Sequence, residues 1–302
     1  MRIATRGSAL ARWQAGYVAD RIRAAAPGTD VEVVVVETTG DLRQDRPVWE
    51  LGGQGVFVKE VQAAVLEGRA DAAVHSAKDL PSTTAPGLTL AALPVRADPR
   101  DVLVGATLEA LGPGAPVATG SVRRRAQLAW VRPDLTFTSL RGNIATRLGR
   151  IPPGGAIVMA AAALERLGLD PPAHQVLDPS VMLPQVAQGA IAVECRSSDH
   201  GARDLLGSID DPDVRACVTA ERAYLARLGG GCDLPVGAHA VIDGRAALRV
   251  DALLASLDGR IMLRDSAAGP RRDASSVGAD LAERILSAGG RAVLAEAGMT
   301  VG

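Results

Sequence analysis

The chain has 302 residues, 47% of them hydrophobic, so it can bury a sizeable core and is expected to form two or three domains rather than one. Its formal net charge of -1 argues against a general electrostatic attraction to nucleic acid or to an anionic membrane. No apolar run is long enough to cross a bilayer, and the N-terminal residues lack the apolar core of a secretory signal, so a soluble, cytoplasmic protein is expected.

Short strand-like runs alternate with helical patterns through the first third of the chain. The predicted elements are a strand over 2–5, a helix over 8–26, a strand over 31–39, a helix over 57–68, and strands over 72–75 and 88–93. This alternation predicts a mostly parallel sheet with helices on its faces. The stretch 94–101, which carries prolines and aspartates, then interrupts the pattern.

A second set of α/β elements follows the interruption. It comprises strands over 102–105 and 116–119, a helix over 121–131, a strand over 135–140, and a strand that runs into a helix over 156–169. Two α/β units joined by a connector predict a cleft between them.

The last part of the chain differs in kind. A helix over 213–228 leads into a glycine-rich loop, and three strand-like segments follow before a closing helix over 277–290. The three segments cover 236–242, 246–256 and 260–267. This α+β pattern predicts a smaller third domain that presents Cys232 from its edge.

The three cysteines show no CxxC spacing, so neither a disulfide framework nor a zinc cluster is supported and no metal is expected. Cys195 lies in an apolar run and Cys217 in a predicted helix, where burial as small apolar groups accounts for both. Cys232 stands between a run of glycines and an Asp-Leu-Pro turn, where packing explains it poorly. On this context alone Cys232 is either a reactive thiol or a structural loop residue.

The basic residues are nearly all arginines, and the exceptions are Lys59 and Lys78. A site that needs a compact ammonium group does not accept a guanidinium fork, so a retained lysine is a candidate functional residue. Chance retention explains Lys59 equally well. It explains Lys78 less well, because His75, Ser76 and Asp79 stand beside it.

Arginines also gather at three predicted strand-to-helix junctions, where free backbone N–H groups and guanidinium forks favour carboxylates or phosphates. Each junction alone could be a solvated basic face, but ligands of α/β folds collect at such junctions. The expected ligand is therefore a small or medium polyanion and not a nucleic acid, since alternating aromatic residues for base stacking are absent there. The junction residues are Arg6 and Ser8; Thr119, Ser121, Arg123, Arg124 and Arg125; and Arg141, Gly142, Asn143 and Arg147.

Asp79 follows a predicted strand and is expected close to this basic cleft, next to Lys78. A local ion pair or a helix cap is one explanation for it. The other is chemical, because an ionised carboxylate in a basic cleft can stabilise a developing cation or move protons.

Several segments together resemble the porphobilinogen deaminase (hydroxymethylbilane synthase) family over essentially the whole chain. No single segment carries the resemblance, but the set occurs in the family's order. The segments are RIATRGSALARWQ, GVFVKEVQAAVLEGRADAAVHSAKDLP, TGSVRRRAQL, SLRGNIATRL, LPQVAQGAIAVECR and ERAYLARLGGGCDLPVG.

The resemblance implies a fold of two α/β domains similar to type II periplasmic binding proteins, plus a smaller α+β C-terminal domain. The implied boundaries are 1–95 for domain 1, to which 188–208 returns, 98–187 for domain 2, and 211–302 for the C-terminal domain. It implies a transferase of porphyrin, tetrapyrrole and heme biosynthesis that joins four porphobilinogen molecules head to tail, with loss of ammonia, and then releases the linear tetrapyrrole by hydrolysis.

The resemblance also implies a dipyrromethane cofactor, held by a thioether to Cys232, and a role for Asp79 in catalysis. It implies a monomer, and a functional coupling to uroporphyrinogen-III synthase. The cofactor-binding residues that it implies are Cys232, Ser76, Lys78, Asp79, Thr119, Ser121, Arg123, Arg124, Arg141 and Gly142. The implied substrate-binding residues are Arg6, Ser8, Phe57, Arg141, Arg147, Arg166 and Gln188, with Phe57 in a lid.

The sequence departs from the family pattern at two positions. Gln54 stands where a lysine is common, which puts one lid-to-substrate ion pair in doubt, and Gly120 stands where a serine is common, which removes a hydroxyl. The competing interpretation is a non-catalytic, two-lobed anion-binding protein. The missing export signal, the third domain and the cysteine loop argue against it.

Overall fold

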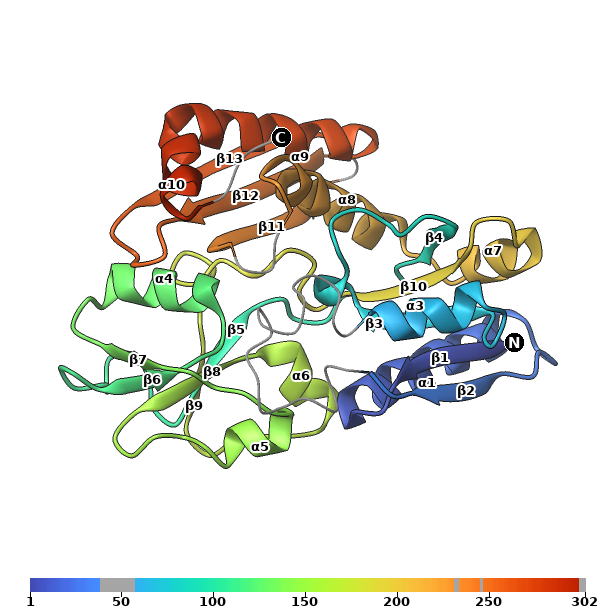
Figure 1. The fold of residues 1–302 in the computed structure, drawn as a ribbon, viewed down its shortest axis with the longest axis horizontal. Coiled ribbons are helices and arrows are strands. Elements are labelled where there is room, and N and C mark those ends of the chain that lie inside the picture. Colours follow the sequence, from blue (N-terminus) through green and yellow to red (C-terminus); the bar gives the residue numbers. More distant parts are fainter. Residues whose placement is uncertain (39–57, 231–233, 245–246, 299–302) are drawn as a thin grey trace. The chain divides into compact units, whose positions relative to one another are not determined.

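The computed structural model describes residues 1–38, 58–230, 234–244 and 247–298 (Figure 1). Cys232, Phe57 and Gln54 lie outside these ranges, so the expectations for them stay predictions. The chain forms two compact units, one of residues 1–97 with 189–215 and the other of residues 98–188 with 216–302. The narrower domain boundaries expected from the sequence also stay predictions.

A five-stranded sheet forms the centre of the first unit, with the strand order β2-β1-β3-β10-β4. Its strands are β1 (Arg2–Arg6), β2 (Glu32–Val36), β3 (Ala72–Ser76), β4 (Leu88–Ala92) and β10 (Ile191–Arg196). Its helices are α1 (Ala9–Ala25), α3 (Lys59–Leu66), the 3₁₀ turn η2 (Ala77–Asp79) and α7 (His200–Gly207).

Helices cover both faces of this sheet because successive residues of a strand point to opposite sides. Ile3 of β1 packs in one apolar cluster with residues of α1 and α7, and its neighbour Ala4 packs in another with residues of α3. Cys195 of β10 belongs to the first of these clusters and is fully buried, which confirms its expected packing role.

The second unit contains another five-stranded sheet, with the order β7-β6-β8-β5-β9. Leu128 of α4 packs on one face and Leu164 of α6 on the other, together with residues of α5. The strands are β5 (Asp101–Val104), β6 (Pro116–Ala118), β7 (Thr136–Thr138), β8 (Ala156–Ala160) and β9 (His174–Val176). The helices are α4 (Val122–Val131), α5 (Ile144–Leu148) and α6 (Ala161–Arg166).

The expectation of a mostly parallel sheet is confirmed in both units, because four of the five described strands of each sheet run in the same direction, but each sheet also contains one antiparallel strand that was not expected. In the first unit β10 runs antiparallel to β3 and β4, and in the second β5 runs antiparallel to β8 and β9. Parallel neighbours arise from local strand-helix-strand crossovers. The strand β10 instead enters its sheet after the chain has built the whole second sheet, so no local crossover sets its direction.

The C-terminal part carries a three-stranded antiparallel sheet, ordered β11-β12-β13, with helices against it. Its elements are α8 (Pro212–Arg227), β11 (Val236–Asp243), β12 (Ala247–Ala255), β13 (Met262–Pro270), the turn η3 (Arg271–Asp273), α9 (Ala274–Ile285), η4 (Leu286–Gly290) and α10 (Arg291–Glu296). Cys217 of α8 is buried, as expected. The predicted fold class, two α/β domains and a smaller α+β domain, is confirmed by these three sheets.

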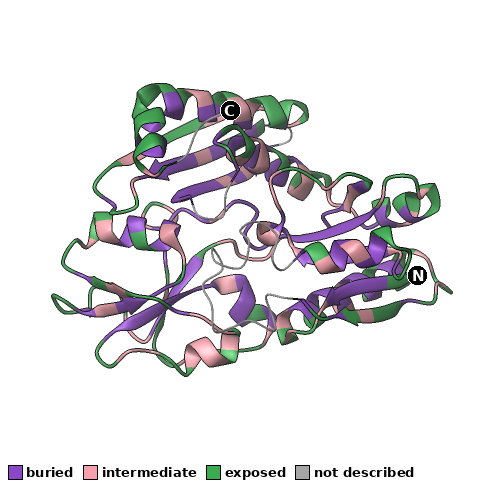
Figure 2. Ribbon diagram, viewed as in Figure 1, coloured by how far each residue is buried: buried purple, intermediate pink, exposed green. Residues whose placement is uncertain are grey.

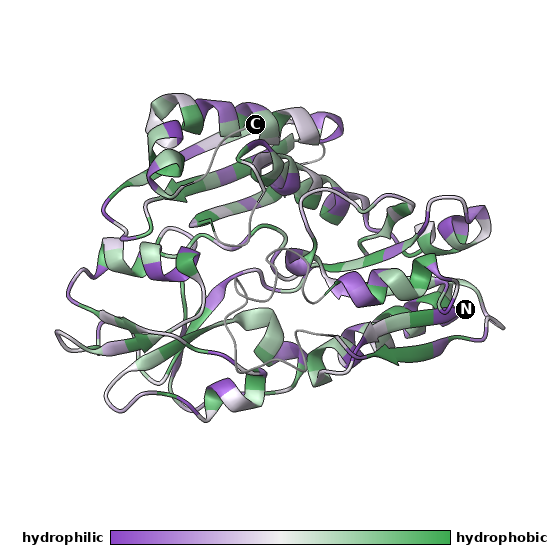
Figure 3. Ribbon diagram, in the orientation of Figure 1, coloured by the Kyte–Doolittle hydropathy of each residue, from purple (hydrophilic) through white to green (hydrophobic). Residues whose placement is uncertain are grey.

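Apolar and polar residues divide within each sheet domain as this architecture requires. The central strands are buried and hydrophobic, and the outward turns of the helices are exposed and hydrophilic (Figures 2 and 3). No helix in the described ranges is long and apolar enough to cross a membrane.

Gly278 lets α9 approach α8 closely, because a Cβ atom at this position would lie 1.9 Å from the carbonyl oxygen of Ala220. We expect Gly278→Ala to lower the free energy of unfolding by about 3 kcal/mol, as overpacking of a rigid contact does. The measurement is the urea midpoint followed by circular dichroism. Gly207→Ala at the end of α7 is the matched control, since open space surrounds that position. An unchanged midpoint for Gly278→Ala would show that the two helices can separate at no cost.

Candidate active site

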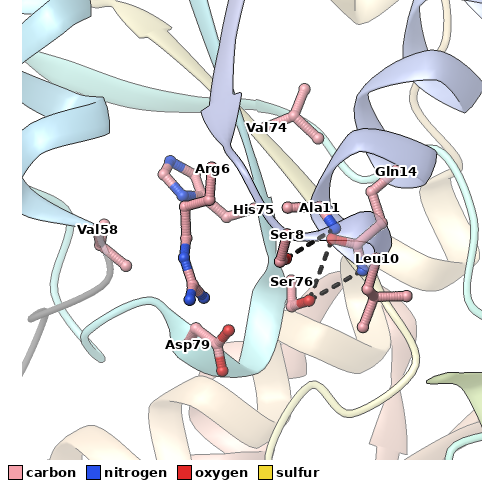
Figure 4. Close-up of a pocket in the computed structure, with 10 residues that line it drawn as sticks. All are labelled: Arg6, Ser8, Leu10, Ala11, Gln14, Val58, Val74, His75, Ser76 and Asp79. Carbon is pink, nitrogen blue, oxygen red and sulfur yellow. Dashed lines mark hydrogen bonds between the residues drawn. The ribbon is translucent and has the colours of Figure 1, made fainter. Parts of the chain in front are cut away.

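The first candidate site lies at the edge of the sheet where β1 and β3 end. These strands are parallel neighbours, so their carboxyl ends meet, and the residues that follow them lie together. Arg6, Ser8, Ser76 and Asp79 line one pocket there (Figure 4). The structure therefore brings together four residues that lie up to 73 positions apart and that the sequence analysis singled out separately.

Two serines of this pocket are fixed by hydrogen bonds to their surroundings. The Ser8 hydroxyl caps α1 by accepting from the backbone N–H of Ala11 at 3.3 Å. The Ser76 hydroxyl accepts from Gln14 Nε2 at 2.9 Å and donates to Gln14 Oε1 at 3.1 Å. Gln14 is buried and was missed by sequence analysis, since a polar residue in an amphipathic helix gives no sign of facing a distant strand.

A buried polar cluster backs the same pocket. His75 Nε2 lies 3.3 Å from Glu194 Oε2, and Gln62 Nε2 donates to that oxygen at 2.8 Å. Register places Glu194 on β10 beside β3, which carries His75. The signal that could have revealed Glu194 is a charged residue inside the apolar run of β10, because a buried carboxylate requires partners.

Lys78 lies on η2 between the serine and the aspartate, and it is not among the described residues that line the pocket. In Figure 4 the Arg6 guanidinium and the Asp79 carboxylate project into the same space from opposite walls. A carboxylate and a cationic side chain therefore line the same pocket, and the cationic side chain is that of Arg6.

The second candidate site lies in the second unit, where β6 leads into α4. The Ser121 hydroxyl caps α4 by accepting from the N–H of Arg124 at 3.4 Å, and Thr119 Oγ1 accepts from the N–H of Ser121 at 3.2 Å. The helix starts where the sequence predicts. Arg125 is exposed, and its guanidinium carbon lies over the ring of Phe137, 6.0 Å from the ring centroid.

The guanidinium groups of Arg123 and Arg124 do not extend into solvent. Both are buried, and both donate to the carboxylate of Asp101 on β5, with shortest distances of 2.7 Å. Arg123 also donates to the carbonyl of Leu183, and Arg124 to the carbonyl of Val158. Their assignment as cofactor ligands stays a prediction. In the structure both guanidinium groups already make hydrogen bonds to other groups of the protein.

Asp101 is fully buried and also accepts from Gln188 Nε2 at 3.0 Å. Burial alone would raise the pKa of Asp101, but the guanidinium groups of Arg123 and Arg124, helped by the Gln188 amide, lower it to about 2. The carboxylate is therefore ionised near neutral pH. Gln188 is itself buried, so it reaches this network rather than an open surface.

The remaining predicted residues of this unit cluster around α5 and α6. Gly142 has φ 111° and precedes Asn143, which caps α5. The Nε of Arg147 donates to the carbonyl oxygen of Gly142 at 2.8 Å. Arg141 is half-buried before this turn, and Arg166 is buried at the end of α6. All of these positions belong to one edge of the second sheet, after strands β7 and β8.

This donor set fits a molecule with several carboxylates. One orphaned group supports the fit, because Arg123 Nε is buried and has no hydrogen-bond partner in the structure. At Gly120 a Cβ atom would lie 2.8 Å from the carbonyl oxygen of Leu140, so a side chain at this position would crowd that oxygen. The described residues contain no group of three or more His, Cys, Asp or Glu side chains that could hold a metal ion.

Fold and sites together define an α/β protein that carries arginine and hydroxyl side chains at the carboxyl ends of its strands, with a carboxylate in the pocket at the ends of β1 and β3. The family described as porphobilinogen deaminase, dipyromethane cofactor binding domain, matches residues 1–204, and its C-terminal domain matches residues 215–287. The chain belongs to the porphobilinogen deaminase family.

Curated relatives agree over nearly the full length. A porphobilinogen deaminase of Roseiflexus castenholzii is 49% identical over 300 residues, which cover 98% of each chain. One of Roseiflexus sp. is 48% identical over 298 residues, which cover 97% of this chain and 98% of the relative. The family is that of the hydroxymethylbilane synthases, transferases of porphyrin and tetrapyrrole biosynthesis with a dipyrromethane cofactor.

Solved structures of periplasmic binding domains show a weaker likeness. The periplasmic VFT2 domain of Bordetella pertussis BvgS matches with a TM-score of 0.42 and 16% identity, covering 69% of this chain and 86% of that one. The amino acid transporter substrate-binding protein AbpA of Streptococcus pneumoniae, bound to L-arginine, matches with a TM-score of 0.36 and 13% identity, with 69% and 86% covered.

Proposed function

We propose that this chain condenses porphobilinogen into hydroxymethylbilane and that Asp79 is its catalytic residue. The observation that supports the role of Asp79 is its place in the pocket at the ends of β1 and β3. Among the ten described residues that line this pocket it is the one carboxylate, and Arg6 and two serines accompany it. A non-catalytic anion-binding protein has no need of a carboxylate in such a pocket, since it would repel the ligand.

The chemistry assigned to Asp79 follows from the charge that develops in the reaction. Loss of ammonia from porphobilinogen leaves an electron-poor, cationic azafulvene. A fixed carboxylate stabilises such a cation and accepts a hydrogen bond from the pyrrole N–H. The free pyrrole carbon of the growing chain attacks the azafulvene and then releases a proton. The same carboxylate can take up that proton.

Binding of porphobilinogen is assigned to cationic and hydroxyl side chains, because each pyrrole carries an acetate and a propionate. Arg6 and Ser8 would hold these carboxylates next to Asp79, and Arg141 and Arg147 would do so in the second unit. Arg166 and Gln188 belong to the same proposal, and Phe57 is proposed as a lid residue.

The cofactor is proposed to be attached by a thioether to Cys232. When bound, dipyrromethane supplies the free pyrrole carbon on which the chain grows. The orphaned Nε of Arg123 is a donor suited to one of its carboxylates. The proposed ligands are Ser76, Lys78, Asp79, Thr119, Ser121, Arg123, Arg124, Arg141 and Gly142.

Three further statements belong to the same proposal. We place the protein in the cytoplasm, as a monomer, in the synthesis of heme or a related tetrapyrrole. Its product is a linear tetrapyrrole, and a functional coupling to uroporphyrinogen-III synthase is proposed with it.

Turnover tests the function directly. Purified protein should consume porphobilinogen continuously and release about one ammonia for each molecule consumed, as the proposed reaction requires. Added uroporphyrinogen-III synthase should convert the product to a cyclic tetrapyrrole. Binding of porphobilinogen without any release of ammonia would instead support the anion-binding protein.

A further inference from the structure

Asp101 joins two arginines that the proposed function assigns to the cofactor. Its Oδ2 accepts from Arg123 Nη2 at 2.7 Å, and its Oδ1 accepts from Arg124 Nη2 at 2.7 Å and from Arg124 Nε at 3.0 Å. The two carboxylate oxygens are thus divided between the two guanidinium groups. One side chain sets the separation and the tilt of both.

Backbone carbonyls hold the far sides of the same guanidinium groups. Leu183 accepts from Arg123 Nη1 at 2.6 Å, and Val158 accepts from Arg124 Nη1 at 3.0 Å. All three nitrogens of Arg124 are therefore engaged by the protein. Arg123 is engaged at both terminal nitrogens, and its Nε has no partner.

The charge of this cluster is unbalanced. Asp101 contributes one negative charge and the two arginines two positive charges, and all three side chains are at most 8% exposed. A buried charge without a partner is costly, so a cluster with one surplus positive charge is suited to an anion from outside the chain. Asp101 itself has no exposed surface through which it could touch that anion.

We propose that Asp101 is the positioning residue of the arginine pair: it fixes Arg123 and Arg124 so that their remaining N–H groups meet the cofactor carboxylates, without contacting the cofactor. This inference rests on the proposed function, which makes both arginines cofactor ligands. A residue that only offset charge would have the opposite effect on an anionic ligand, since its removal would strengthen the attraction.

The test is Asp101→Asn, which keeps the shape of the side chain and removes its charge. If Asp101 positions the arginines, the fraction of purified chains that carry the two-pyrrole mass should fall by about tenfold or more, the lower range seen when the outer partners of a bound group are removed. The fraction is measured by intact mass spectrometry. In the chains that do carry the cofactor, KM for porphobilinogen should rise.

Asp134→Asn is the matched control. Asp134 is also a carboxylate paired with an arginine, Arg132, at 2.6 Å, but it lies beyond the other end of α4 and is partly exposed. We expect its cofactor content and its KM to equal those of the wild type. The wild type separates the two hypotheses: if it carries no two-pyrrole mass, the proposed function fails, whereas a wild-type level in Asp101→Asn overturns only the role of Asp101.

Asp101→Asn leaves two buried guanidinium groups without a counter-charge, which can prevent folding. The double variant Asp101→Asn, Arg124→Gln keeps one surplus positive charge and serves as the second measurement. If Asp101 positions both arginines, its removal from Arg124→Gln should lower the cofactor content by less than its removal from the wild type does, because only Arg123 then remains to be positioned. A further additive loss in the double variant, or a higher cofactor content in Asp101→Asn than in the wild type, would overturn the proposal.

Discussion

Asp79→Asn is expected to keep the covalent two-pyrrole adduct and to lose turnover by about 10²- to 10³-fold, the usual effect of removing one group that stabilises developing charge. The amide keeps the size of the side chain and can still occupy the pocket beside Arg6. It carries no negative charge, so the cation left by loss of ammonia is not stabilised. The measurement is the release of ammonia per adduct-bearing chain, which removes any effect of cofactor loading.

Asp20→Asn is the control for this variant. Asp20 lies on α1 of the same unit, and its side chain is 77% exposed and paired with Arg23 at 2.9 Å. A surface pair of this kind contributes little, so turnover should stay at the wild-type level. Normal turnover by Asp79→Asn would remove Asp79 from the catalytic role and leave the cap or local ion pair as its explanation.

The second large effect is expected at the cysteine loop. Cys232→Ala removes the sulfur to which the cofactor is proposed to be attached. The purified variant should show the mass of the bare polypeptide and no consumption of porphobilinogen. The wild type should show an additional mass of two pyrrole units.

Cys217→Ala is the matched control, since Cys217 is a buried cysteine within α8. It should lose some stability, as removal of a buried group does, but keep the adduct. If the adduct persists in Cys232→Ala and disappears in Cys217→Ala or Cys195→Ala, the cofactor is attached to that other cysteine and the proposal for Cys232 is wrong. A wild type that turns over without any adduct would contradict the covalent attachment altogether.

Most elements of the fold were predictable because their signals are local. The helix α1 begins after Ser8, and α4 begins after Ser121. A serine directly before a run with helical periodicity predicts such a start. The short elements β9, α7 and α10 were not predicted, since segments of three to eight residues give weak periodicity. The candidate residues at strand-to-helix junctions were predictable for the same local reason.

The sequence by itself determined the family, the positions of most helices and strands, and the residue types available at each junction. Only the tertiary structure decided that Arg123 and Arg124 are held by Asp101, that Gln14 holds Ser76, and that β5 and β10 run antiparallel to their neighbours. These are contacts between residues far apart in the chain; Gln188 and Asp101, for example, are 87 positions apart. A buried charge takes its partner from whatever the packed core places beside it, and that neighbour exists only once the sheets have assembled.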